Sequence, residues 1–284
     1  MTSSIFLNYF VKNTLLNSIN KIVFYLLFLS LLFTGKYSFA QLQFIENKGQ
    51  WNSNVNFWSD INSGAFFLEK NGFTVLLQNS DDLRIFSDHI HGHLKTDSSN
   101  SSTALSKNRI LISSPQMQND NFVIRSHAYK VSFAGSSKNV EVQSDKALPT
   151  YNNYFIGNDK SKWQSNCKIF QGVTYKNMYP NIDVRYYTDA GTLKYDIIVH
   201  PGGNVGDIAL KYDGIDKLSI RNKELIIKTS VGEVKELYPY TFEVAKTGRT
   251  SINCKYILKN NTVTFKVDSY SPDATIVIDP TLIF

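Results

Sequence analysis

The fold class is decided by residues 184–199, VRYYTDAGTLKYDIIV. Apolar or aromatic residues alternate with polar ones on both sides of Asp189-Ala190-Gly191, which is a run of turn-forming residues. Alternation with a period of two is typical of a strand with one buried face, so two such runs around a short turn predict an antiparallel hairpin. The second strand should end at Pro201-Gly202-Gly203, because proline cannot donate to a strand ladder.

The same alternation recurs along most of the chain. Two apolar runs flank Asn71-Gly72, a pair that supplies the positive φ angles of a type I′ turn and therefore predicts a hairpin. Another strand is expected over 129–133, before Gly135. Downstream we expect turns at Asp213-Gly214, Asn222-Lys223 and Asn260-Asn261, a single strand containing Ile252, Cys254, Tyr256 and Leu258, and a last strand over Ile276–Ile278.

Many short strands joined by polar turns are typical of antiparallel sheets packed face to face. The chain also contains 16 Tyr and 19 Phe, residues that fit half-buried pleated surfaces. We therefore predict an all-β fold, an antiparallel β-sandwich, built either as one large sandwich or as two packed ones.

The first forty residues have the pattern of a secretory signal peptide. Lys12 and Lys21 precede an apolar run over 22–33, and Ser38-Phe39-Ala40 places small residues where a signal peptidase reads them. As a helix the run would span roughly 18 Å, well short of the roughly 30 Å hydrocarbon core. We expect cleavage after Ala40 and export of residues 41–284; an uncleaved anchor is the alternative.

Residues 41–284 are long enough for one large or two small domains. Ser and Asn dominate residues 96–121, which predicts a surface insertion within one all-β domain. The alternative places a boundary there, between lobes of about 41–95 and 122–284.

The charge gives little support to nucleic-acid binding. The whole chain has 30 basic and 24 acidic residues, and three of the lysines lie before residue 41, which leaves a net charge of +3 beyond it. So small a surplus, spread along the chain, does not form a basic patch. We expect no nucleic-acid partner and no transmembrane segment after Ala40.

Five phrases together resemble a known family. They are FIENKGQW (44–51), YNNYFIGND (151–159), VTYKNMYPNID (173–183), LKYD (193–196) and IDPT (278–281). These resemble the N-terminal extracellular domain, itself of unknown function, of large secreted or surface proteins in gliding bacteria. Such proteins continue into β-propeller repeats, Ig-like or similar modules and a gliding-motility-associated C-terminal sorting domain used by type IX secretion.

Because no active site is recognisable in the sequence, we expect a non-enzymatic exported module with a structural or adhesive role at the cell surface or outside the cell, with the periplasm as another location. The resemblance implies a longer propeller-containing protein, although this sequence ends at Phe284; either the chain is a fragment or the domain stands alone. It offers no catalytic residues. A carbohydrate-binding or carbohydrate-degrading accessory domain is the alternative, and the expected partner is a protein or a glycan.

A metal site is the first chemical candidate. On a strand, His89, His91 and His93 would share one face, as metal-binding imidazoles do. A polar strand or loop with solvent-facing histidines is the alternative. No catalytic set and no cofactor site is predicted.

The two cysteines, Cys167 and Cys254, form the second candidate. Export permits a disulfide, and each cysteine is in phase with apolar neighbours, so both side chains are expected to face inward. They either pair or remain two buried thiols.

Aspartates and tryptophans each allow two interpretations. Strand-end aspartates serve as turn formers or as the carboxylate pair of a glycosidase. Trp51, Trp58 and Trp163, together with the many tyrosines, form either a sugar-stacking platform or core and cross-strand pairs. Trp163 is predicted as a core anchor, because it begins a strand after the polar loop over 158–162. The aspartates are Asp183, Asp189, Asp196, Asp207, Asp213 and Asp216.

Overall fold

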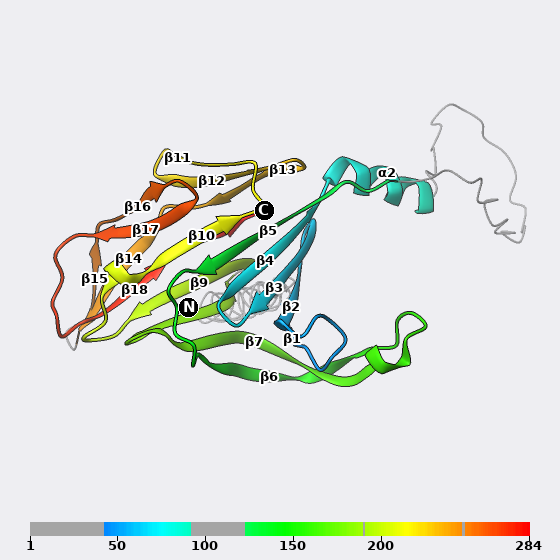
Figure 1. Cartoon of the computed structure of the whole chain (residues 1–284), viewed down its shortest axis with the longest axis horizontal. Helices are drawn as coiled ribbons and strands as arrows, with labels where there is room; N and C mark the ends of the chain where they lie inside the picture. The colour runs from blue at the N-terminus through cyan, green and yellow to red at the C-terminus, as the bar shows by residue number, and fades with distance from the viewer. Residues whose placement is uncertain (1–42, 92–122, 190, 246–247) are drawn as a thin grey trace, which may run out of the picture. The chain divides into compact units, whose positions relative to one another are not determined.

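Antiparallel strands dominate the computed structural model, which describes residues 43–91, 123–189, 191–245 and 248–284 (Figure 1). The all-β prediction is therefore confirmed. The first elements are β1 (Phe44–Glu46), β2 (Val55–Ile61), β3 (Gly64–Glu69), β4 (Gly72–Gln78), α2 (Ser80–His91), β5 (Ser126–Phe133), β6 (Glu141–Tyr154), the 3-10 turn η1 (Lys160–Lys162), β7 (Gln164–Tyr179), β8 (Ile182–Asp189) and β9 (Thr192–Val199). They are followed by η2 (Val205–Asp207), β10 (Ala209–Asp213), β11 (Lys217–Arg221), β12 (Glu224–Thr229), β13 (Gly232–Glu236), β14 (Tyr240–Ala245), β15 (Gly248–Ile252), β16 (Cys254–Lys259), β17 (Thr262–Val267), β18 (Thr275–Asp279) and β19 (Leu282–Ile283).

The predicted hairpins form where alternation and turn residues coincide. In β8–β9, Tyr186 lies opposite Tyr195, and both side chains are buried. In β11–β12, Asn222 and Lys223 have φ angles of 53° and 67°, as a type I′ turn requires. The β3–β4 hairpin also forms, but the turn predicted at Asn71-Gly72 is wrong. Glu69 pairs with Gly72, so the turn residues are Lys70 and Asn71.

The long strand β7 joins the two layers of the sandwich. Phe170 pairs with Phe44 of β1 and, on its other edge, with Ala147 of β6. Two residues later, Gly172 pairs with Tyr187 of β8 and again with β6. Strands β1 and β8 therefore occupy successive parts of one edge of β7. From this junction one layer runs β1-β2-β3-β4-β5-β10-β17-β16, and the other runs β8-β9-β18-β14-β15.

The two layers face each other. Phe73 of β4 lies 6.1 Å from Tyr186 and 6.3 Å from Tyr195 of β9, measured between ring centroids. Strands β4 and β9 are six positions apart in the sheet order, so a flat sheet would separate them by about 29 Å. The sheet therefore folds over on itself, and its inner side chains form one continuous core.

The chain closes the far end of the sandwich at Asn253. Ile252 ends β15, which pairs with β14, and Cys254 begins β16, which pairs with β17 in the other layer. The prediction of one strand through Ile252 and Leu258 is therefore wrong, because the chain changes layers within it. A separate four-stranded sheet, β11-β12-β13-β19, also contributes to the core.

Residues 80–91 form a helix where the sequence predicted a polar strand or loop. The Asn79 side chain accepts from the backbone N–H of Asp82 at 3.0 Å, and Asp81 and Asp82 lie in the first turn. A side-chain acceptor at the start and acidic residues in the first turn both favour helix formation. The Ser- and Asn-rich residues 96–121 lie outside the described residues. Strands β4 and β5, on either side of them, pair directly through Gln78 and Ser126.

No helix in the described ranges is both long and apolar enough to cross a lipid bilayer.

Candidate functional site

The β6–β7 hairpin extends well beyond the neighbouring strands and ends in a turn that we call the arm tip, residues 155–163 (Figure 1). All nine residues of the arm tip are exposed. They include Phe155, Ile156 and Trp163, with exposed fractions of 59%, 77% and 37%. Large apolar side chains held in solvent at the end of a projecting hairpin point to a contact surface.

The arm tip is an ordered turn. Asp159 caps η1 by accepting from the backbone N–H of Ser161 at 3.1 Å. The indole Nε1 of Trp163 donates to the carbonyl of Gly157 at 3.1 Å, and its ring lies 5.8 Å from that of Phe155 in an edge-on arrangement. The prediction that Trp163 anchors the core is therefore wrong, because the strand it precedes leaves the sandwich before the tip.

A small hydrophobic cluster, the root cluster, supports the arm where it leaves the sandwich. Its ring contacts run from Trp51 to Trp58, stacked at 5.6 Å, and from Trp51 to Tyr154 of β6 at 5.1 Å. These two tryptophans are partly buried and contact each other. Trp51 lies in the loop between β1 and β2, so the contact joins a loop to a strand and is not a cross-strand pair. The members are Ile45, Trp51, Trp58, Leu148, Tyr154, Cys167 and Ile169.

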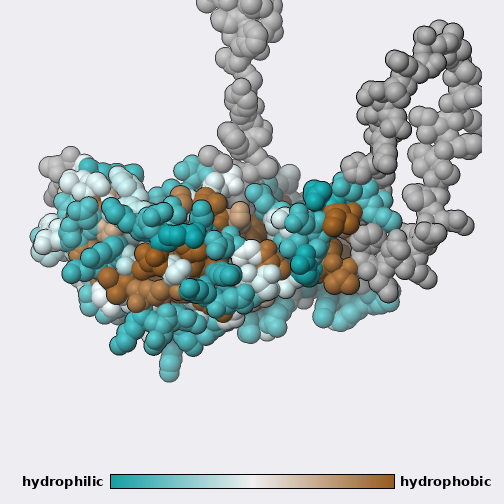
Figure 2. Space-filling model, turned by 90° about the horizontal axis from the view of Figure 1, so that it is seen from above, coloured by the Kyte–Doolittle hydropathy of each residue, from teal (hydrophilic) through white to brown (hydrophobic). Residues whose placement is uncertain are grey.

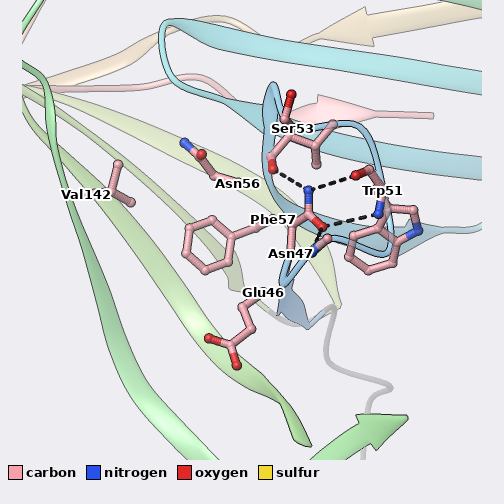
Figure 3. Close-up of a pocket in the computed structure, with 9 residues that line it drawn as sticks. Glu46, Asn47, Trp51, Ser53, Asn56, Phe57 and Val142 are labelled. Carbon is pink, nitrogen blue, oxygen red and sulfur yellow. Dashed lines mark hydrogen bonds between the residues drawn. The ribbon is translucent and has the colours of Figure 1, made fainter. Parts of the chain in front are cut away.

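A groove of about 570 Å³ lies beside the root cluster (Figure 3). Trp51 lines one end of it and Val142 of β6 the other, with Phe57 and Asn56 between them. Glu46 is the one acidic residue in the lining, and its Oε1 accepts from the backbone N–H of Lys168 at 2.8 Å. The groove therefore combines aromatic and apolar walls with an amide and a carboxylate.

Asn47 organises the loop that forms one wall of this groove. Its Nδ2 donates to the carbonyls of Asn52 and Val55 at 2.9 and 2.7 Å, and its Oδ1 accepts from Gly49 and Trp51 at 3.0 and 3.2 Å. The dashed lines of Figure 3 show the Asn47 side chain at the centre of the loop. Because its polar atoms are used inside the loop, Asn47 holds Trp51 in place.

The predicted aspartates mostly have local partners. Asp183 is buried and accepts from Lys176 at 2.7 Å and His200 at 2.8 Å, as well as from the backbone of Asn177. Burial alone would raise its pKa, but these hydrogen bonds outweigh burial and hold the pKa below the usual range. Elsewhere Asp189 approaches Lys194, Asp207 accepts from Asn204, Asp213 pairs with Lys211, and the backbone of Asp216 donates to Lys228.

Among these aspartates, Asp196 has the pKa that is raised furthest above the usual value. Burial, and then the nearby carboxylate of Asp279, raise its pKa to about 6. Asp279 is held by Lys194 at 2.8 Å, and Asp196 accepts from the hydroxyl of Tyr187 at 3.1 Å. The phrases 193–196 and 278–281 thus meet in space, where they connect β9 to β18. None of these residues lines the groove of Figure 3.

The histidine prediction rests on the wrong secondary structure. His89 and His91 lie in α2, and a helix turns about 100° per residue, so the shared strand face does not exist. His93 lies outside the described residues. Within the described ranges, no group of three or more metal-ligating side chains gathers.

The two cysteines are both free and buried. Cys167 belongs to the root cluster, whereas Cys254 belongs to the main core between the layers. The structure therefore places no disulfide between them. Both were expected to face inward, but only Cys254 does so; Cys167 is covered by the root cluster on the outer face of its strand.

A buried carboxylate at Glu236 was not predicted. It lies on β13 with no exposed surface, and it accepts from the hydroxyls of Tyr195 and Tyr212, the latter at 2.9 Å. These tyrosines belong to opposite layers, so Glu236 connects the two layers through the small sheet. The sequence did carry one sign of this burial, because Glu236 lies two positions after Val234 and side chains two apart on a strand face the same side.

A further set of apolar side chains lies on the face viewed in Figure 2. Seen from the side where β11–β13 and α2 lie in Figure 1, hydrophobic residues gather in patches among hydrophilic ones. Exposed apolar residues of these elements include Ile220 of β11 and Ile85 of α2. The two exposed residues named here lie on separate elements, whereas those of the arm tip lie within nine residues of the chain, so this face is weaker ground for a site than the arm tip.

A known protein family matches most of the chain. Residues 44–281 match a family described as "Domain of unknown function (DUF7948)". No curated protein and no solved structure matches the chain. The match covers the same stretch as the five phrases, which begin at Phe44 and end at Thr281, and gives a domain of unknown function there. Since the match spans most of the chain, this protein belongs to the DUF7948 family.

Proposed function

We propose that the protein is a non-enzymatic, exported adhesive module that contacts its partner through the arm. The observation that carries this proposal is the ordered arm tip, which presents Phe155, Ile156 and Trp163 to solvent. A folded protein rarely exposes clustered large apolar side chains unless they bind something. The root cluster supports the function, because it anchors a long hairpin that would otherwise be a single two-stranded ribbon.

The wider context of the proposal comes from the sequence resemblance. We place this module at the N-terminus of a longer surface or secreted protein of a gliding bacterium, followed by propeller repeats and a type IX sorting domain. In that position the arm would act as one contact point of a large surface assembly.

The adhesive proposal predicts binding that depends on the arm tip. Residues 41–284 form a compact unit that contains every described core residue. The binding experiment is therefore made with residues 41–284. The purified unit is expected to sediment with washed bacterial envelopes, and Phe155→Ser combined with Ile156→Ser should weaken binding at least tenfold. The matched control combines Tyr240→Ser with Val244→Ser, which also removes two exposed apolar side chains. Equal binding by both double variants and the wild type would refute the proposal.

Carbohydrate binding is the second candidate, because the groove of Figure 3 combines Trp51 with the polar Asn56 and Glu46. Its volume of about 570 Å³ lies within the range typical of ligand sites. Hydrolysis is less favoured than binding, since a glycosidase needs two carboxylates about 5–10 Å apart and the lining supplies one.

This second candidate is tested on a glycan array followed by calorimetry. Asn56→Ala combined with Glu46→Gln is expected to reduce affinity for any bound glycan at least tenfold, because the first change removes an amide contact and the second removes the acceptor charge of the groove. Asn62→Ala, an exposed amide outside this groove, serves as the control and should leave affinity unchanged. A wild-type protein that binds no glycan, or a double variant that binds as well as the wild type, rules out this site.

A further inference from the structure

We infer that the arm tip binds the surface of an anionic lipid bilayer, with its apolar side chains at the headgroup boundary. This inference rests on the proposed adhesive function and names the partner class.

The exposed apolar surface suits a membrane better than a protein partner. A large apolar or aromatic side chain covers about 150–250 Å², so the exposed parts of Phe155, Ile156 and Trp163 amount to roughly 300 Å². Specific protein interfaces bury about 800 Å² on each partner. The tip offers less than half of this area, but it can enter a bilayer surface without a complementary pocket.

The polar groups of the tip are arranged so that the apolar groups can be desolvated. The Trp163 indole N–H already donates to the Gly157 carbonyl, so the ring can leave water without losing a hydrogen bond. Backbone hydrogen bonds from Lys162 to Asp159 and from Trp163 to Lys160, both 3.1 Å, close the turn internally. The tip is therefore preorganised, and binding requires little additional ordering.

Lysines surround the apolar tip. Lys160 and Lys162 are exposed within it, and the Lys160 Nζ lies 5.7 Å from the centroid of the Trp163 ring. Lys48 donates to the Ser165 carbonyl at 3.0 Å, at the base of the tip. The nearby acids are Asp159, which caps η1, and Glu46 beside Lys168. Basic residues beside exposed Trp and Phe are typical of segments that lie on anionic membranes.

The test measures co-sedimentation of residues 41–284 with protein-free vesicles of phosphatidylcholine alone and of phosphatidylcholine with 30 mole percent phosphatidylglycerol. We expect binding to the anionic vesicles at least tenfold stronger than to the neutral ones. Phe155→Ser with Ile156→Ser should reduce it at least tenfold. Lys160→Gln with Lys162→Gln should remove most of the anionic preference, since each lysine near an anionic surface contributes about fivefold. The control is again Tyr240→Ser with Val244→Ser.

The outcomes separate this inference from the adhesive function. Binding to envelopes without binding to vesicles would overturn the lipid assignment and leave the adhesive function standing. Binding to neither would overturn both. Vesicle binding that survives the Phe155 and Ile156 changes, in variants with unaltered circular dichroism and melting temperature, would show that another surface contacts lipid and would also overturn the inference.

Discussion

Replacing Glu236 by alanine is expected to lower the free energy of unfolding by about 3–5 kcal/mol. The side chain is fully buried, and its two oxygens accept from Tyr195 of one layer and Tyr212 of the other. Alanine would leave both hydroxyls without an acceptor and would open a cavity at the junction of three sheet segments. Urea unfolding followed by fluorescence measures the loss.

The control for this change is Glu233→Ala on the same strand. Glu233 is exposed and pairs with Arg221 at 3.3 Å. Its removal should alter stability by no more than about 0.5–1 kcal/mol, because exposed ion pairs contribute little. Equal losses at the two positions would mean that Glu236 is not the connection between the layers that we describe.

The same carboxylate also predicts a pH dependence. Burial raises the pKa of Glu236 above its usual value of 4.5, and the hydrogen bonds from Tyr195 and Tyr212 only partly oppose this. A folded-state pKa above the unfolded value means that the folded state holds the proton more tightly. The contribution to stability is therefore fully present below the unfolded pKa and is lost as pH rises through the folded one.

Glu236→Gln isolates this effect, because glutamine has nearly the same shape but does not titrate. The stability of the variant relative to the wild type is expected to rise between pH 4 and the raised pKa and then level off. Taking the difference cancels the contribution of Asp196, whose pKa of about 6 has the same sign. Unfolding curves at one-unit pH intervals measure it. A difference independent of pH would contradict the assignment.

Gly72→Ala is expected to cost at least about 3 kcal/mol or to prevent folding. A Cβ built on Gly72 would lie 2.0 Å from the carbonyl oxygen of Val131 and 3.0 Å from the Cα of Ser132. Both are backbone atoms of β5, which pairs with β4, so relief requires the two strands to separate. The φ angle of Gly72 is not in the left-handed region, and therefore the cost is steric.

Gly135→Ala separates this clash from the general effect of replacing glycine. Gly135 has a φ of 74°, with no atom within 4 Å of an added Cβ, so only the left-handed conformation is penalised, by about 1 kcal/mol. Thermal melts of the two variants are compared directly. A Gly72 variant as stable as the Gly135 variant would show that β4 and β5 are not as closely paired as described.

Local pattern was a good guide to strands and a poor guide to the sites. The alternation of Leu193, Tyr195, Ile197 and Val199 predicted a strand with these side chains buried, and all four are. The helix over 80–91 was missed although Asn79, Asp81 and Asp82 supplied a start signal, because the histidine alternation was interpreted with a strand period. Trp163 was predicted to anchor the core because it begins a strand after a polar loop, but that strand starts outside the sandwich.

The sequence by itself determined the strands and most of the tight turns, since alternation and turn chemistry act between residues only a few positions apart. It also carried the family resemblance. Tertiary structure alone decided that β7 offers one edge to both β1 and β8, and that Cys167 and Cys254 lie in different clusters. It also decided that Glu236 is buried between two layers while Trp163 is exposed. Each of these depends on contacts between segments distant in the chain, and a local pattern says which face of a strand is apolar but not what will cover it.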